Sequence, residues 1–203
     1  MVRLLKFLLA TSNTLYFYFT SLDVASTSIE QRYDTYSTTY EVINGGQPAE
    51  VFGMNELRKQ AGARAYGNVL EIAVGTGLQA KYYDPAHLKS FTGVDISAGM
   101  LQQAQKSLAT SLPYTQSTLA IMNAQALAFS SNSFDTVVDT FSMCVVPQPE
   151  LAIAEMARVV KPGGKVILLE NTKSDNAFVA TLQVGLFSFS IFILFYFSFK
   201  LFF

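Results

Sequence analysis

The sequence predicts an α/β protein built on a doubly wound parallel sheet, with helices covering both faces of the sheet. Two observations support this prediction. Short apolar runs that fit buried strands alternate with segments of helical periodicity through the middle of the chain. The first of these runs stops at Gly75 and Gly77, as a buried parallel strand does where it enters a glycine turn.

Five apolar runs qualify as strands because each is short and bounded by turn residues. They cover residues 68–73, 91–95, 118–122, 134–141 and 165–170. Ser97 is a good N-cap for a helix with four apolar residues on one face: Met100, Leu101, Ala104 and Leu108. Pro149 suits the first turn of a second helix, with expected apolar positions Leu151, Ala154, Ala157 and Val160. The Pro-Gly-Gly segment 162–164 should end that helix.

The composition limits the classes of function. A length of 203 residues fits one domain with short extensions, and 14% charged residues exclude a disordered polyelectrolyte. The net charge of -1 leaves no basic surplus for phosphates, so we expect no nucleic-acid partner. A single Cys and a single His exclude a disulfide framework and a Cys/His zinc site, and we expect no metal.

The two ends differ from the middle and divide the chain into three segments. Residues 1–27 combine two basic residues with an uncharged run, which indicates a signal peptide, a transit peptide, a membrane anchor or an unusual buried helix. Residues 28–177 should form the α/β domain. Residues 178–203 contain nine of the 17 Phe residues and begin with 22 uncharged residues, enough to span a bilayer as a helix. We therefore expect the protein to associate with a membrane through one or both of its ends.

Polar side chains stand at the expected carboxyl ends of the strands, where an open parallel sheet binds its ligands. Glu71 lies on the first strand, ahead of the glycine turn, and Asp95 ends the second strand. Asn123 and Ala124 follow the third strand. An acid at the tip of the second strand can accept hydrogen bonds from both hydroxyls of a ribose.

Residues next to this possible ribose contact indicate that the ligand is a nucleoside-containing cofactor. Ile96 and Met100 offer an apolar slot for adenine, and the amide of Asn123 can both donate to and accept from the adenine edge. The loop lacks the third glycine of the G-x-G-x-x-G pattern that holds a pyrophosphate. Glu71 would repel phosphate but suits the cationic amino-acid end of S-adenosyl-L-methionine, which is the cofactor we expect.

Four stretches resemble the class I S-adenosylmethionine-dependent methyltransferases, which have a Rossmann-like fold, and in particular their type-11 branch. The stretches are 69–77 (VLEIAVGTG), 93–97 (GVDIS), 124–135 (AQALAFSSNSFD) and 155–164 (EMARVVKPGG). They occur in the family's order, and the resemblance covers about residues 33–174. Residues 140–144 and 169–174 are similar to small membrane-anchored members in mitochondria and the endoplasmic reticulum.

The resemblance implies roles for individual residues. Glu71, Gly75 and Gly77 would hold the amino-acid part of S-adenosylmethionine, with Ala73 in the same loop. Five residues would hold the adenosine: Asp95, Ile96, Met100, Asn123 and Ala124. The segment that contains Tyr33, Tyr36 and Tyr40 resembles an aromatic lead-in that folds over the cofactor.

Three departures from the family pattern matter. Ala73 replaces the first glycine of the motif I turn, and Asn123 and Gln125 stand where acids are common. The family's sheet has seven strands, whereas here the sixth and seventh are missing, so we expect a fold truncated after the fifth strand. The Phe-rich end stands in their place, either as an anchor or as sequence appended by a truncated or misread gene model.

The sequence therefore predicts an enzyme that transfers a methyl group from S-adenosylmethionine to a small, apolar acceptor such as a quinone, a lipid or a thiol. No catalytic residue is assigned, because the sulfonium already activates the methyl group and the protein mainly has to align it. The alternative is a non-catalytic, membrane-associated scaffold that keeps a truncated methyltransferase fold. The expected location is a mitochondrial or endoplasmic reticulum membrane.

Overall fold

The computed structural model describes residues 28–41, 53–172 and 198–202. Its centre is a six-stranded sheet in the order β3-β2-β1-β4-β5-β6. The first five strands are parallel, and β6 pairs antiparallel with β5. The strands are β1 Gly67–Ile72, β2 Leu88–Asp95, β3 Gln116–Ile121, β4 Phe134–Thr140, β5 Val160–Thr172 and β6 Ser198–Phe202. The predicted doubly wound parallel sheet is confirmed.

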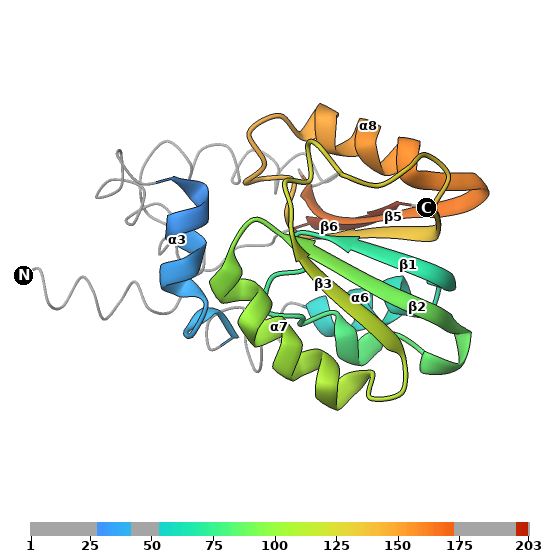
Figure 1. Cartoon of the computed structure of the whole chain (residues 1–203), viewed down its shortest axis with the longest axis horizontal. Helices are drawn as coiled ribbons and strands as arrows, with labels where there is room; N and C mark the ends of the chain where they lie inside the picture. Colours follow the sequence, from blue (N-terminus) through green and yellow to red (C-terminus); the bar gives the residue numbers. More distant parts are fainter. Residues whose placement is uncertain (1–27, 42–52, 173–197, 203) are drawn as a thin grey trace, which may run out of the picture.

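Helices cover both faces of this sheet (Figure 1). Helices α6 (Met54–Gly62) and α7 (Ala98–Ser111) lie on one face, and α8 (Pro149–Val159) lies on the other. The short helix α3 (Ile29–Tyr36) stands beside the start of α7. Two short 3-10 helices, η1 (Ala80–Tyr82) and η2 (Pro85–His87), connect β1 to β2.

The core divides into two layers because side chains alternate between the two faces of a strand. In β1, Val69 packs with residues of α6 and α7, whereas Leu70 and Ile72 pack with residues of α8. Glu71 shares the alternation of Val69, so its side chain points to the face that α6 and α7 cover. This direction decides which helix can contact the acid.

Helix α7 agrees with the sequence prediction in both its start and its buried face. Ser97 is the N-cap, and its hydroxyl accepts a hydrogen bond from the backbone N–H of Met100 at 3.0 Å. The buried residues of α7 are the four that the periodicity selected: Met100, Leu101, Ala104 and Leu108. Since β2 ends two residues before this cap, Asp95 lies next to the N-terminus of α7.

Helix α8 begins at Pro149 as predicted, but its predicted buried face is wrong. The buried residues are Ala152, Met156 and Val159. Leu151, which was expected in the core, is 43% exposed. Two apolar stripes share this helix, and only its contact with the sheet decides which one is covered. The Pro-Gly-Gly segment lies within the irregular start of β5 and not in a loop before it.

The structure also contains a strand that the sequence did not predict. Residues Ser198–Phe202 of the Phe-rich end form β6 along β5, so the sheet continues one strand past the expected truncation. The long uncharged run concealed this strand because such a composition fits a membrane helix as well as a β-segment.

The predicted targeting or anchor segment 1–27 and residues 178–197 of the tail lie outside the described residues. Their roles stay predictions. In residues 28–41, 53–172 and 198–202, no helix combines the length and the apolar character that a membrane crossing requires.

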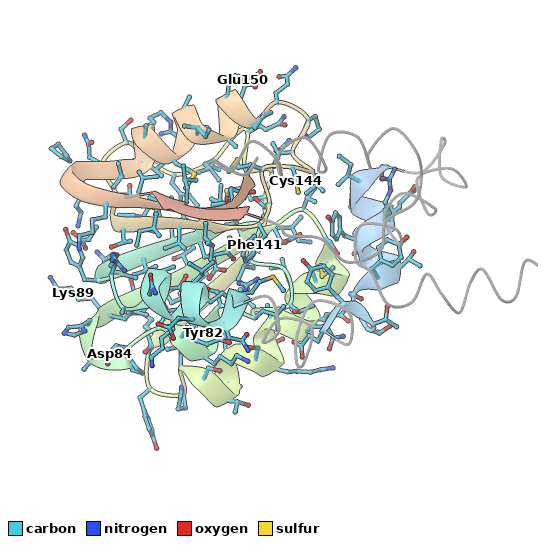
Figure 2. The ribbon with its side chains drawn as sticks, turned by 180° about the vertical axis from the view of Figure 1, so that it is seen from behind. Tyr82, Asp84, Lys89, Phe141, Cys144 and Glu150 are labelled. Carbon is cyan, nitrogen blue, oxygen red and sulfur yellow. The ribbon has the colours of Figure 1, made fainter. Side chains whose placement is uncertain are left out.

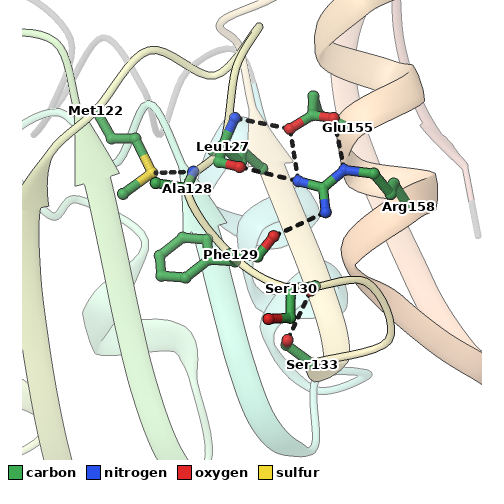
Figure 3. A network of polar contacts seen from close by, with 8 residues as sticks. All are labelled: Met122, Leu127, Ala128, Phe129, Ser130, Ser133, Glu155 and Arg158. Carbon is green, nitrogen blue, oxygen red and sulfur yellow. Dashed lines mark hydrogen bonds and ion pairs between the residues drawn. The ribbon is translucent and has the colours of Figure 1, made fainter.

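An ion pair on α8 fixes the loop that follows β3 (Figure 3). Arg158 donates to the two carboxylate oxygens of Glu155, at 2.7 and 2.8 Å. The same guanidinium donates to the carbonyls of Phe129 and Leu127, at 2.7 and 2.9 Å. Glu155 in turn accepts from the backbone N–H of Leu127 at 2.7 Å. Charge-assisted bonds of this kind hold the loop, which begins near Asn123, against α8.

Candidate functional site

The predicted site begins at the end of β1, where Glu71 points toward α6. Helix α6 carries Arg58 on the same side, and both side chains are buried, at 1% and 8% exposure. The two residues line one small cavity together with the loop that follows β1. The cavity has a volume of ≈ 20 Å³, room for about one water molecule. A buried carboxylate and a buried guanidinium therefore share one space.

The environment of Glu71 favours its protonated form. Its carboxylate accepts a hydrogen bond from the hydroxyl of Tyr83 at 2.8 Å. Burial raises the pKa of Glu71 to about 7, although the bond from Tyr83 and the charge of Arg58 act in the opposite direction. A cation that binds beside Glu71 would favour the ionised carboxylate, so this acid is suited to a positively charged ligand group.

Arg58 is held by residues from two other parts of the chain. Its Nη1 donates to Oγ1 of Thr140 at 3.0 Å and to Oε1 of Gln79 at 3.4 Å. The guanidinium also lies 4.9 Å from the centre of the Phe141 ring. Phe141 has a φ of 63°, a left-handed conformation that bulky residues rarely adopt. Figure 2 shows Phe141 and Cys144 at the end of the sheet that faces α3.

One polar atom at this cavity has no hydrogen-bond partner among the described residues. Thr76 is 1% exposed, it lines the cavity with Glu71 and Arg58, and its hydroxyl is unpaired. An unsatisfied buried hydroxyl costs about 1–3 kcal/mol, which a ligand that bonds to it would recover. The cavity therefore offers an acid, a cation and a neutral hydroxyl to one ligand.

The loop after β1 turns through three left-handed residues, with φ of 46° at Ala73, 56° at Gly75 and 79° at Gly77. A Cβ at Gly77 would lie 3.0 Å from Cβ of Ser107, so this glycine lets the loop pack on α7. A Cβ at Gly75 would meet only the Ala73 carbonyl, at 3.9 Å, so the loop is open there. Ala73 adopts its conformation at a steric cost that a glycine would avoid.

Asp95 joins this loop to the end of β2 and the start of α7. Its Oδ2 accepts from the N–H of Gly75 at 2.8 Å, and its Oδ1 accepts from the N–H of Ser97 at 2.9 Å. The backbone N–H of Met122 donates to the Asp95 carbonyl at 2.9 Å, so the loop after β3 begins beside it. Burial raises the pKa of Asp95, against the effect of these amides. Each carboxylate oxygen has a further lone pair for a ligand.

The residues predicted to hold adenine lie in different surroundings. Ile96 is half-buried, and Ala124 is buried in the layer beneath α8. Asn123 is exposed, and its Oδ1 accepts from the N–H of Gln125 at 2.9 Å, which fixes the turn after β3. Met100 is 1% exposed, so it offers no open apolar slot in this conformation.

Two tyrosines of the N-terminal segment, Tyr33 and Tyr40, lie near Glu71 and Asp95, and we call them the tyrosine cover. Tyr40 lines the cavity with Glu71, and its ring centre is 6.4 Å from that of Tyr33. Burial raises the pKa of Tyr33, and the neighbouring Tyr40, Cys144 and Asp95 add to this rise. The tyrosine cover therefore lies near the ends of β1 and β2.

A further pair of acids stabilises the turn after β4. Asp139 is fully buried and accepts from the hydroxyl of Ser142, while Glu170 accepts from the N–H groups of Ser142 and Met143 at 2.8 and 3.1 Å. Burial and the adjoining carboxyl of Glu170 raise the pKa of Asp139 well above its ordinary range. These contacts fix the turn that places the Phe141 ring beneath the guanidinium of Arg58.

Sequence reasoning found the two acids and the glycine loop but missed the polar groups that surround Glu71. Arg58 and Tyr83 lie outside the stretches that resemble the family, and Thr76 stood only as a spacer between two glycines. A charged residue on the inner face of an amphipathic helix was the one signal that could have identified Arg58.

Comparisons with known proteins agree with this architecture. Residues 70–168 match the methyltransferase-domain family. The phosphatidylethanolamine N-methyltransferase of Cereibacter sphaeroides is 38% identical over 120 residues, 59% of this chain and 58% of that protein. The ubiquinone/menaquinone biosynthesis C-methyltransferase UbiE of Shewanella halifaxensis is 30% identical over 183 residues, 82% of this chain and 68% of that protein. The chain spans about three-fifths of the length of the first relatives it matches.

A solved structure shows the same fold at lower identity. The [4+2]-cyclase SpnF superposes with a TM-score of 0.61 and 22% identity, over 73% of this chain and 62% of that one. At this identity the likeness concerns the fold alone. With the family match and the UbiE relative, the chain belongs to the class I S-adenosylmethionine-dependent methyltransferases, in their type-11 branch.

We expect Ala73→Gly to raise the free energy of unfolding by about 0.5–1 kcal/mol. Glycine removes the clash of a left-handed alanine, which costs about 1–2 kcal/mol, and its greater freedom in the unfolded chain offsets part of that gain. The matched control is Ala63→Gly, since Ala63 has a φ of -62° and gains nothing from glycine. Urea unfolding measures both, and an equal loss of stability in the two variants would contradict the prediction.

We expect Glu71 to make the ligand-free protein less stable as the pH rises. Its pKa lies at about 7 in the folded protein and at 4.5 ordinarily, so the unfolded state releases this proton first. Between these values the free energy of unfolding should fall by about 3 kcal/mol through this group. Glu71→Gln should remove that dependence in urea unfolding at about pH 5 and about pH 8. If the free energy of unfolding of Glu71→Gln still falls with pH, other groups cause the pH dependence.

Proposed function

We propose that the protein transfers the methyl group of S-adenosylmethionine to a small, apolar acceptor. The main support for the proposal is that the glycine loop after β1 joins two neighbouring candidate binding sites. Glu71 and Arg58 share a cavity at the end of β1, and Gly75 connects that cavity to Asp95 at the end of β2. Two such sites on adjacent strands suit a ligand with a zwitterionic end and a ribose.

The cavity would take the amino-acid end of the cofactor. Glu71 would pair with the ammonium group, since a cation stabilises its ionised form. Arg58 and the unpaired hydroxyl of Thr76 would bind the carboxylate, because a guanidinium donates to carboxylates in a planar, directional manner. Gly75 and Gly77 let the backbone pass close to this part of the ligand.

The end of β2 would take the adenosine. Asp95 keeps lone pairs free for the ribose hydroxyls while it holds Gly75 and Ser97. Ile96 and the loop that begins at Asn123 would border the adenine. Met100 and Ala124 would support this border from within the core.

Bound S-adenosylmethionine supplies a methyl group that its sulfonium already activates, so the protein mainly binds and aligns. Glu71 and Asp95 would fix the two ends of the cofactor, which determines where the region between them lies. Burial raises the pKa of Tyr33 further above its ordinary value, so its phenol stays protonated at neutral pH and can donate a hydrogen bond but does not act as a base. The tyrosine cover would exclude water from the same region.

The nature of the acceptor is inferred from the relatives and from the ends of the chain. The named relatives act on phosphatidylethanolamine and in ubiquinone or menaquinone biosynthesis. An acceptor with an apolar part is consistent with both, and with hydrophobic ends that favour a membrane surface. A mitochondrial or endoplasmic reticulum membrane is the location we propose on this basis.

Calorimetric titration with S-adenosylhomocysteine tests the function. We expect the protein to bind it, and Asp95→Ala to weaken binding by about 100-fold or more, because two charged hydrogen bonds to the ribose are lost. Asp84→Ala, which removes an exposed carboxylate from the N-cap of η2, should bind normally. A folded protein that does not bind would favour the non-catalytic scaffold, and tight binding of NADH instead would contradict both functions.

Arg58→Met tests the carboxylate contact separately, because methionine keeps an apolar stem of similar length without the charge. The affinity for S-adenosylhomocysteine should fall about tenfold or more, since one charge-assisted contact is lost. The affinity for 5′-methylthioadenosine, which lacks the amino-acid end, should not change. Calorimetry with both ligands measures this, and an equal loss for the two would show that Arg58 acts only through the fold.

A further inference from the structure

We propose that Asp34 is a positioning residue whose carboxylate fixes helix α3 to the first turn of α7 and so keeps the tyrosine cover over the cofactor site. The identity of the cofactor rests on the proposed function, whereas the contact itself can be tested without ligand. Asp34 would not touch the cofactor; it would act through α3.

One carboxylate oxygen of Asp34 accepts two hydrogen bonds from the start of α7. Its Oδ1 accepts from the hydroxyl of Ser97 at 2.5 Å and from the backbone N–H of Gly99 at 2.8 Å. Both donors lie at the start of α7, where backbone N–H groups lack helical partners and a negative charge is favoured. The same bonds hold the pKa of Asp34 below its ordinary value, so the carboxylate is ionised at neutral pH.

Gly99 allows α3 to come this close. A Cβ at Gly99 would lie 2.9 Å from Oγ of Ser37, 3.1 Å from Oδ1 of Asp34 and 3.2 Å from Cα of Asp34. Glycine in a helix is unfavourable relative to alanine, so α7 gives up helical stability at this position. The carboxylate of Asp34 on α3 and the absence of a side chain at Gly99 on α7 therefore both contribute to the same contact.

The contact continues into the cofactor site through a series of hydrogen bonds. Ser97 donates its hydroxyl to Asp34 and its backbone N–H to Oδ1 of Asp95, at 2.9 Å. The other oxygen of Asp95 accepts from Gly75 at 2.8 Å. Helix α3 is therefore linked to the end of β2 and to the glycine loop, the two places that would hold the cofactor.

Helix α3 also determines where the tyrosine cover lies. Tyr33 immediately precedes Asp34, and Tyr40 lines the cavity beside Glu71. With the cover in this position the cavity holds ≈ 20 Å³, room for about one water molecule. The cover must move for the cofactor to enter and to leave. The strength of the Asp34 contact would then set how often α3 separates from α7, and with it the dissociation rate of the cofactor.

Stopped-flow measurement of S-adenosylhomocysteine dissociation, followed by the fluorescence of the protein's 10 tyrosines, tests this role. Asp34→Ala and Gly99→Ala should each raise the dissociation rate about tenfold, the effect of one charged hydrogen bond. Asp34→Asn keeps an accepting oxygen and should raise it less. The matched control is Glu30→Ala, which removes an exposed carboxylate from the same helix and should leave the rate unchanged.

Hydrogen exchange of the ligand-free protein separates the contact from the proposed function. In Asp34→Ala and Gly99→Ala the backbone amides of α3 should exchange about tenfold faster, while those of β1 stay unchanged. The double variant should add little to either single variant, because both break the same contact.

Two results would overturn the inference. One is that Gly99→Ala raises the thermal midpoint, as alanine ordinarily does in a helix, and leaves exchange in α3 and ligand dissociation unchanged. The other is that Asp34→Ala behaves like Glu30→Ala in both measurements. If the unaltered chain does not bind S-adenosylhomocysteine but exchange in α3 responds as expected, the Asp34 contact is supported and the proposed function fails.

Discussion

The burial of a carboxyl group and a guanidinium at the end of β1 is the constraint on which the site depends. A buried charge is tolerated only when it is paired or hydrogen-bonded, because water no longer solvates it. Tyr83 satisfies the carboxylate of Glu71, and Thr140 with Gln79 satisfies the guanidinium of Arg58. The surrounding loop and helix are positioned by these bonds. A ligand with both charges is the occupant that such a cavity stabilises most.

Asp95 has a structural and a proposed binding role at the same place. It holds the glycine loop through Gly75 and the start of α7 through Ser97, so the loops that would contact a cofactor are fixed relative to each other before it binds. Preformed geometry of this kind lowers the entropy that binding has to offset. The Asp34 contact adds the N-terminal helix to the same set of bonds, so the cover and the site would move together.

Much of the fold could be predicted because its signals are local. The five parallel strands are short apolar runs bounded by turns, and α7 has a capping serine and one unambiguous apolar face. Helix α8 has two apolar stripes, so its buried face depended on where the sheet lies. The strand β6 could not be predicted, since Ser198–Phe202 overlaps the end of a long apolar run and is defined by its pairing with β5.

The sequence by itself determined the five parallel strands, the helices α7 and α8, the glycine turn, and the two acids at the ends of β1 and β2. These features follow from periodicity and from residue types at fixed spacing. Only the tertiary structure decided that Arg58, Thr76 and Asp34 belong to the same region. The reason is physical: alternation along β1 turns Glu71 toward one face, and the packing of separate helices on that face decides which distant side chains reach it.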